Sequence, residues 1–96
     1  MPASIEWSRP ALIDLRNIGS WLNDQASGEV ALRTLSAIRR RATFLETHPH
    51  GGRPEADGLR VLLVRGTPYL IIYRIFADSV QVLRIRHERE DWQVVP

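Results

Sequence analysis

Cysteine and lysine are both absent from this sequence of 96 residues. Without cysteine, the chain has no disulfide framework and no metal site built on thiolates. Long apolar runs are also missing, since a stretch such as Tyr69–Tyr73 is far shorter than the roughly 20 residues that cross a bilayer as a helix. The first residues lack the basic, apolar and small-residue pattern of a secretory signal. We therefore expect a single domain over residues 1–96, located in the cytoplasm and not in a membrane.

Arginine supplies all of the positive charge: 13 basic residues face 11 acidic ones, for a formal net charge of +2. The planar guanidinium donates hydrogen bonds to carboxylates, phosphates and base edges, and it tolerates partial burial better than an ammonium group. A GC-rich genome would produce the same bias through its codons. The net charge is too small to indicate non-specific binding of nucleic acid, so the positions of the arginines matter more than their number.

Metal and cofactor sites are not indicated. His48 and His50 flank Pro49, but two imidazoles without a nearby group of carboxylates fall short of a metal site. Gly51-Gly52 is typical of a turn, and it does not follow a strand as a phosphate-binding loop would. We expect no metal ion and no cofactor.

Two amphipathic helices are predicted in the first half of the chain. A short strand at 4–7 precedes Ser8, which supplies an N-cap oxygen to a helix that ends near Asp24. A second start signal at Ser27 begins a similar apolar stripe, which ends at His48 because the next residue is proline. The link between the helices is short, so they form an antiparallel αα-hairpin.

Three strand-like runs follow a loop rich in glycine and proline, at residues 59–65, 69–76 and 80–87. Gly66-Thr67-Pro68 and Ala77-Asp78-Ser79 are short enough to join them as antiparallel neighbours. The chain is therefore predicted to be an α+β domain of order β-α-α-β-β-β, in which the αα-hairpin packs on one face of a small antiparallel sheet.

The middle run carries apolar residues on both of its faces. Alternate positions give Tyr69, Ile71, Tyr73 and Ile75 on one face and Leu70, Ile72, Arg74 and Phe76 on the other. A single helical hairpin covers only one face of a sheet, and the free face of an antiparallel sheet is usually polar. An exposed apolar patch of this size marks a partner site, so we expect a second polypeptide to cover it.

Several short motifs, spread over nearly the whole chain, have a recognisable order. They are Trp7-Ser8, Ala11, Asp14-Leu15 and Ile18; Leu45 to Pro49 with Gly51-Gly52-Arg53; Gly58-Leu59-Arg60; Pro68 to Arg74; and Val82 to His87 with Arg89 and Trp92. No single motif is diagnostic, but their combined order and spacing resemble the RelE/ParE toxin superfamily. Within it, the chain is most similar to the ParE-like branch, the toxin halves of bacterial type II toxin–antitoxin pairs.

The resemblance implies an antitoxin partner that wraps the toxin in a hetero-oligomer, with a ParD-like or similar DNA-binding head and a helical tail. On this chain the antitoxin would lie on the second apolar face and the helical hairpin, with sheet contacts at Leu70, Ile72, Arg74, Phe76, Val80 and Val82. It also implies a target for the freed toxin. ParE-like members trap DNA gyrase on cleaved DNA, whereas RelE-like members cut mRNA on the ribosome.

The nuclease alternative requires a base, an acid and cations around the phosphate. Arg60, Arg86, His87 and Arg89 are the residues that could supply them. RelE-like enzymes use a strongly basic groove, often with lysines and a late tyrosine or histidine, and this chain has neither lysine nor a C-terminal tyrosine. Regular alternation also places His87 on the opposite strand face from Arg84 and Arg86. We therefore favour a toxin that binds without catalysis; a non-toxic adaptor descended from a toxin is a third interpretation.

The target contact is predicted in the C-terminal strand and tail, at Arg84, Arg86, His87, Arg89 and Trp92. Structural roles are the alternative for each of these residues. The histidine would bond to backbone at a strand end, and the tryptophan would cap the edge of the core. The arginines would pair with acidic residues of the tail, although exposed pairs of that kind contribute little.

Overall fold

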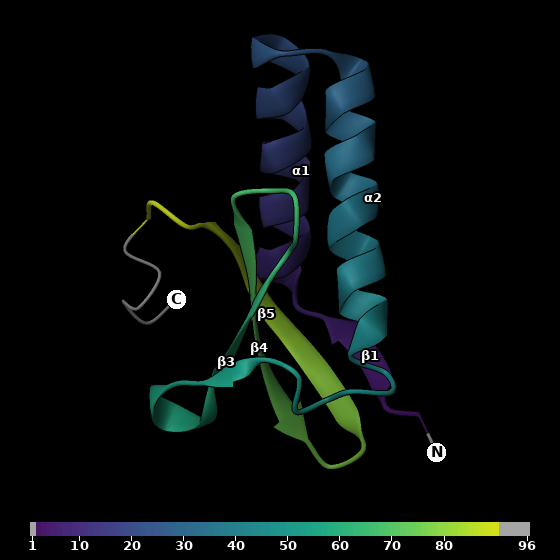
Figure 1. Ribbon diagram of the computed structural model, residues 1–96, viewed down its shortest axis with the longest axis vertical. Helices are drawn as coiled ribbons and strands as arrows, with labels where there is room; N and C mark the ends of the chain where they lie inside the picture. The colour runs from purple at the N-terminus through teal and green to yellow at the C-terminus, as the bar shows by residue number, and fades with distance from the viewer. Residues whose placement is uncertain (1, 91–96) are drawn as a thin grey trace.

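The computed structural model describes residues 2–90 of the chain. Its elements are, in order, β1 (Ser4–Trp7), α1 (Arg9–Gln25), α2 (Gly28–Phe44), β2 (Arg53–Pro54), the 3-10 turn η1 (Ala56–Gly58), β3 (Arg60–Leu63), β4 (Tyr69–Phe76) and β5 (Ser79–His87). The strands form one sheet in the order β1-β5-β4-β3-β2, and the two helices lie side by side as a hairpin (Figure 1). The predicted α+β architecture is confirmed.

Both helices begin as their sequences predict. The hydroxyls of Ser8 and Ser27 each accept a hydrogen bond from the backbone N–H three residues later, at 3.1 Å, which satisfies one of the donors left free at a helix N-terminus. Gly19 allows the helices to approach, because a β-carbon there would lie 3.0 Å from Cδ1 of Leu35. The α-helical part of α2 ends at Phe44 and not at the predicted His48.

The residues between Phe44 and His48 continue as a tighter turn. The N–H of Glu46 bonds to the carbonyl of Thr43 and the N–H of Thr47 to that of Phe44, three residues back in each case. Such i to i−3 bonds commonly tighten the last turn of a helix.

The first strand makes the sheet mixed. β1 runs parallel to β5, with Ser4 opposite Ser79 and Trp7 opposite Val82, while the other three strand pairs are antiparallel. The β3–β4 and β4–β5 pairs were predicted, whereas β2 lies in the segment predicted to be a loop. No turn in the sequence indicates the parallel pairing, because the αα-hairpin and three further strands separate β1 from β5. A parallel neighbour always needs a long connection of this kind.

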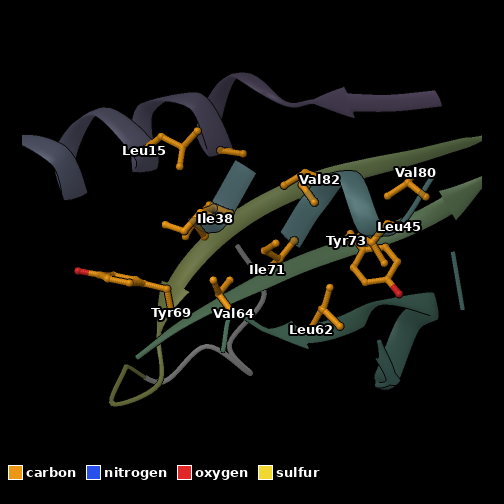
Figure 2. Close-up of a cluster of buried hydrophobic side chains, with 13 residues drawn as sticks. Leu15, Ile38, Leu45, Leu62, Val64, Tyr69, Ile71, Tyr73, Val80 and Val82 are labelled. Atoms are coloured by element: carbon orange, nitrogen blue, oxygen red, sulfur yellow. The ribbon is translucent and has the colours of Figure 1, made fainter. Parts of the chain in front are cut away.

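The main core fills the space between the hairpin and one face of the sheet (Figure 2). Its largest fully buried side chains come from α2, β4 and β5 and from the residues directly after α2 and β3: Ile38, Leu45, Val64, Ile71, Tyr73, Val80 and Val82. The apolar sides of the helices and of the sheet therefore pack against each other in one layer, as expected for a two-layer α+β domain.

Tyr73 extends from this core to the loop after α2. Its hydroxyl accepts a hydrogen bond from the N–H of Gly52 at 2.8 Å and donates one to the carbonyl of Pro49 at 2.8 Å. Burial raises the pKa of Tyr73, so the hydroxyl stays protonated and able to donate. A β-carbon at position 52 would lie 2.7 Å from the Tyr73 hydroxyl oxygen, which explains the glycine.

We predict that Tyr73→Phe lowers the free energy of unfolding by about 2 kcal/mol, because the Gly52 N–H and the Pro49 carbonyl both lose their buried partner. Urea denaturation followed by circular dichroism measures the change. Tyr69→Phe is the matched control, since the Tyr69 hydroxyl has no hydrogen bond within residues 2–90. Equal effects of the two substitutions would show that the loop does not depend on the Tyr73 hydroxyl.

Candidate functional site

A β-bulge divides β5 into two halves. Ile72 of β4 pairs with Arg84, but the next residue, Tyr73, pairs with Val82, so Leu83 has no partner on β4. One extra residue in a strand reverses which face the following side chains occupy. Val80 and Val82 therefore share the helix-covered face with Ile71, Tyr73 and Ile75, whereas Arg84 and Arg86 share the outer face with Leu70 and Ile72.

The bulge corrects two of the predicted antitoxin contacts. Val80 and Val82 each have 0% of their surface exposed and lie in the main core. Regular alternation had placed them on the outer face with Arg84, and the bulge at Leu83 breaks that alternation. Neither valine is available to a partner while the domain is folded.

The outer face is also less open than its sequence predicts. Leu70 and Ile72 are 8% and 1% exposed, and they form a small second cluster with Val61, against which Leu59 packs. The expectation of a wide apolar surface along β4 is therefore wrong for these two residues.

Two predicted contact residues on the outer face are exposed. They lie towards the far end of β4: Arg74, whose Nε donates to Oε1 of Gln81 at 2.7 Å, and Phe76, which is 63% exposed.

The start of α1 is fastened to β5 at the bulge. The backbone N–H of Ser8 donates to the carbonyl of Val82 at 2.9 Å, and its hydroxyl donates to the carbonyl of Leu83 at 2.8 Å. One turn further, Asp14 accepts a hydrogen bond from the N–H of Ile85 at 2.9 Å. β1 pairs with β5 only as far as Val82, so these side chains occupy the edge that β1 leaves open.

Asp14 also binds the side chain of Arg84 through both of its oxygens. Nε of Arg84 lies 2.8 Å from Oδ2 and Nη2 lies 2.9 Å from Oδ1, and the two side chains are 21% and 12% exposed. The hydrogen bond to Asp14 raises the pKa of Arg84. Sequence reasoning assigned Arg84 to target binding and missed its pairing with Asp14. In this structure the Arg84 guanidinium stabilises the fold and is not available to bind a target.

The end of β5 carries the other predicted target residues. Arg86 lies opposite Leu70 and His87 opposite Tyr69, so the two occupy opposite faces, as their spacing predicts. Nη1 of Arg86 approaches Oε2 of Glu90 at 3.5 Å, a loose contact with a half-exposed carboxylate. Such a pair is easily exchanged for a partner's anion.

His87 and the residues after it form a tight turn. The N–H of His87 donates to Oε1 of Glu90 at 2.8 Å, and the N–H of Arg89 donates to Nδ1 of His87 at 3.1 Å. The imidazole also makes an edge-to-face contact with the Tyr69 ring, at 5.5 Å between centroids. This turn fixes the imidazole and leaves the side chain of Arg89 exposed. Trp92, the remaining predicted contact, lies outside the described residues.

Arg60 is not brought to this end of the sheet. It lies opposite Tyr73, four residues along β4 from the partner of His87, which corresponds to ~13 Å of strand. Its Nη1 donates to the carbonyl of Gly52 at 2.8 Å and to that of His50 at 3.3 Å. The four residues of the nuclease alternative therefore do not form one cluster.

A cleft of about 330 Å³ opens on the outer face beside the bulge. It is lined by Ser8, Pro10, Asp57, Leu59, Arg74, Leu83 and Arg84. Leu59 and Leu83 make part of its lining apolar. Arg74 adds a positive charge and Asp57 a negative one, while the Arg84 guanidinium is already paired with Asp14. An apolar side chain with a neighbouring carboxylate has the matching chemistry.

The described residues contain no group of three or more histidine, cysteine, aspartate and glutamate side chains placed to hold a metal ion. No helix among residues 2–90 is long and apolar enough to cross a membrane.

Comparison with known proteins identifies related sequences. The family model described as the ParE toxin of type II toxin–antitoxin system, parDE, matches residues 5–92. Toxin RelE3 of Caulobacter vibrioides is 34% identical over 89 residues, which cover 91% of this chain and 96% of that protein. Y4kP of Sinorhizobium fredii, named as a candidate toxin, is 32% identical over 92 residues, covering 95% and 94% respectively.

Solved structures with the same arrangement include toxin–antitoxin systems. A chain of the chromosomal ParDE system from P. aeruginosa has a TM-score of 0.80 at 26% identity, covering 88% of this chain and 95% of its own. A chain of the RelBE2 complex from Mycobacterium tuberculosis has a TM-score of 0.69 at 26% identity, covering 91% and 99%. A chain of the E. coli DinJ–YafQ complex shares the fold alone, with a TM-score of 0.63 at 13% identity.

We predict that Asp14→Ala lowers the free energy of unfolding by about 2 kcal/mol, because the Arg84 guanidinium and the Ile85 N–H lose a partly buried acceptor together. Asp24→Ala, which removes an exposed carboxylate from the same helix, is the control and should change stability by less than about 0.5 kcal/mol. Urea titrations of the three proteins measure both values. Similar stabilities for the two variants would mean that Asp14 does not hold the edge of β5.

Proposed function

Because the chain belongs to the ParE toxin family of type II toxin–antitoxin systems, we propose that it arrests bacterial growth by binding DNA gyrase and trapping the enzyme on cleaved DNA. Membership in this family, within the RelE/ParE superfamily, makes the protein the toxin of a ParDE-like pair. The choice of gyrase as the target, and of binding in place of catalysis, is the proposal.

The separation of Arg60 from the end of β5 is the observation that supports binding over RNA cleavage. A nuclease needs its acid, base and cations around one phosphate. Here the Arg60 guanidinium donates to two loop carbonyls. His87 lies ~13 Å further along the sheet, where the Tyr69 ring and the turn after β5 hold its imidazole. A binding surface has no such requirement, and exposed cations at one end of a strand are sufficient for it.

The proposed gyrase contact is the end of β5 with the turn that follows, at Arg86, His87 and Arg89. The guanidinium of Arg86 is held only loosely by Glu90, and that of Arg89 is exposed. Arginines with weak internal partners lose little on exchanging them for carboxylates of another protein. Trp92 would extend the same contact. Arg84 is not part of it, because its two strong hydrogen bonds go to Asp14.

We predict that the purified toxin inhibits supercoiling by gyrase and accumulates cleaved DNA, and that Arg86→Ala with Arg89→Ala abolishes both effects. Loss of two cations from a central contact commonly costs more than tenfold in affinity. Agarose-gel assays of supercoiling and cleavage measure the outcome, and induction in cells without the antitoxin measures growth arrest.

The control variant for this experiment combines Arg9→Ala with Arg16→Ala. Both arginines are exposed on α1, so the substitution removes the same charge from a different element. Full inhibition by the R86A/R89A protein would remove the end of β5 from the contact.

A second candidate function is ribosome-dependent cleavage of mRNA, which the relationship to toxin RelE3 favours. Cut mRNA in a translation extract, together with unimpaired gyrase, would select it.

The antitoxin contact is proposed on the outer face, at Arg74, Phe76 and the cleft lined by Leu59 and Leu83. The exposed Phe76 ring, two residues along β4 from Arg74, suits an apolar side chain on an amphipathic segment of a partner, and the Arg74 guanidinium suits an acidic residue on it. Leu70 and Ile72 lie in the buried cluster against which Leu59, one of the residues that line the cleft, packs.

We predict that Phe76→Ala weakens antitoxin binding at least tenfold without unfolding the toxin, because an exposed ring contributes to binding and not to the core. Phe76→Tyr retains the ring and should keep most of the affinity. Isothermal titration calorimetry with the purified antitoxin measures both. An unchanged affinity for the alanine variant would move the contact away from this end of β4.

A further inference from the structure

Five arginines lie on or directly beside α2, whose only acidic side chain is Glu29 in its first turn. Four belong to α2 and one to the turn between β3 and β4: Arg33, Arg39, Arg40, Arg41 and Arg65. Arg39 lies roughly 160° around the helix from Arg41, so the other four are here called the α2 basic surface. No aspartate or glutamate occurs between Val30 and Leu45. None of the ion pairs among residues 2–90 includes any of the five. The small net charge of the chain therefore hides a strong local excess of positive charge.

Arg41 is fixed at the centre of this surface. Its Nε donates to the carbonyl of Leu63 at 2.8 Å, and its guanidinium carbon lies 4.7 Å from the centroid of the Phe44 ring. The same ring stacks on His48 at 4.5 Å. Partial burial and repulsion by Arg65 lower the pKa of Arg41. The two residues line the same shallow cleft.

Arg40, Arg41 and Arg65 line a shallow cleft of about 260 Å³, together with Ala37, Phe44 and Val64. Guanidiniums that meet from two elements around one cleft repel one another unless an anion joins them. We propose that this cleft and the adjoining face of α2 bind the phosphodiester backbone of a nucleic-acid duplex. The toxin would then contact nucleic acid directly, in addition to the protein that it inhibits.

Duplex nucleic acid fits this surface better than an acidic peptide does. Backbone recognition depends on cations placed along the phosphates and needs no deep apolar pocket. Arg33 and Arg40 are seven residues apart, two helical turns or ~10 Å along the same side of α2. A peptide partner would bring apolar anchors, and the residues that line the cleft offer only a shallow floor for them.

Binding of a fluorescein-labelled DNA duplex to the purified full-length toxin tests the proposal, by anisotropy at several salt concentrations. The key variant combines Arg40→Ala with Arg65→Ala, because both side chains are exposed and neither has a hydrogen bond or ion pair within residues 2–90. We predict that the slope of log K against log salt becomes shallower by about 1.8, since each lost phosphate contact contributes about 0.9. Affinity at moderate salt should fall roughly tenfold.

The R9A/R16A variant is again the matched control, since it removes two exposed arginines from α1. It should keep the slope and affinity of the parent protein. Equal losses in the two variants would mean that only overall charge matters, and unchanged binding by R40A/R65A would place the contact elsewhere; either result overturns the proposal. An RNA duplex of the same sequence shows which nucleic acid the cleft prefers.

A poly-glutamate peptide tests the competing class of partner. If it binds more tightly than either duplex and loses binding in R40A/R65A, the cleft is a protein-binding site and the proposal is wrong. The gyrase assay is separate, because naked duplex is the ligand here. A toxin without effect on gyrase would refute the proposed target and leave the nucleic-acid site standing.

Discussion

The attachment of α1 to β5 is the constraint on which the rest of the molecule depends. Ser8 caps the helix through its hydroxyl oxygen and also donates to two β5 carbonyls at the bulge. Asp14 then satisfies the N–H of Ile85 on the edge that β1 does not reach. An unpaired strand edge invites association with other chains. The helix therefore closes the edge and, by stabilising the bulge, decides which side chains of β5 face outwards.

Much of the fold could be predicted because its signals are local. The strand at 69–76 and both helix starts follow from alternation, helical periodicity and two serine caps. The parallel pairing of β1 with β5 could not be predicted, since it joins distant segments without a turn between them. The bulge did leave a trace in the sequence. Apolar residues alternate up to Val82, and Leu83 then shifts the phase by one, so that Ile85 and not Arg84 faces the core.

The candidate site was less predictable because its charged side chains pair with residues that are distant in the sequence. Asp14 resembles its exposed neighbours on the helix, and only the position of β5 turns it into the acceptor for Arg84. Burial of Leu70 and Ile72 depends on packing with Val61 of β3, which strand alternation does not report. Sequence patterns thus identified the strands that carry the outer surface but not which of their residues remain available.

The exclusive use of arginine has a structural basis, whatever the codon preference of the genome. Arg84 binds both oxygens of a carboxylate, Arg60 spans two loop carbonyls, and Arg41 joins a carbonyl to an aromatic ring. The bidentate pairing of Arg84 and the ring contact of Arg41 depend on the planar guanidinium, which an ammonium group cannot reproduce in the same geometry. Arginines so engaged stabilise the fold. Arg86 at the end of β5 has only a loose contact with Glu90, and Arg40 and Arg65 beside the cleft on α2 have no side-chain hydrogen bond within residues 2–90, so these guanidiniums are available to partners.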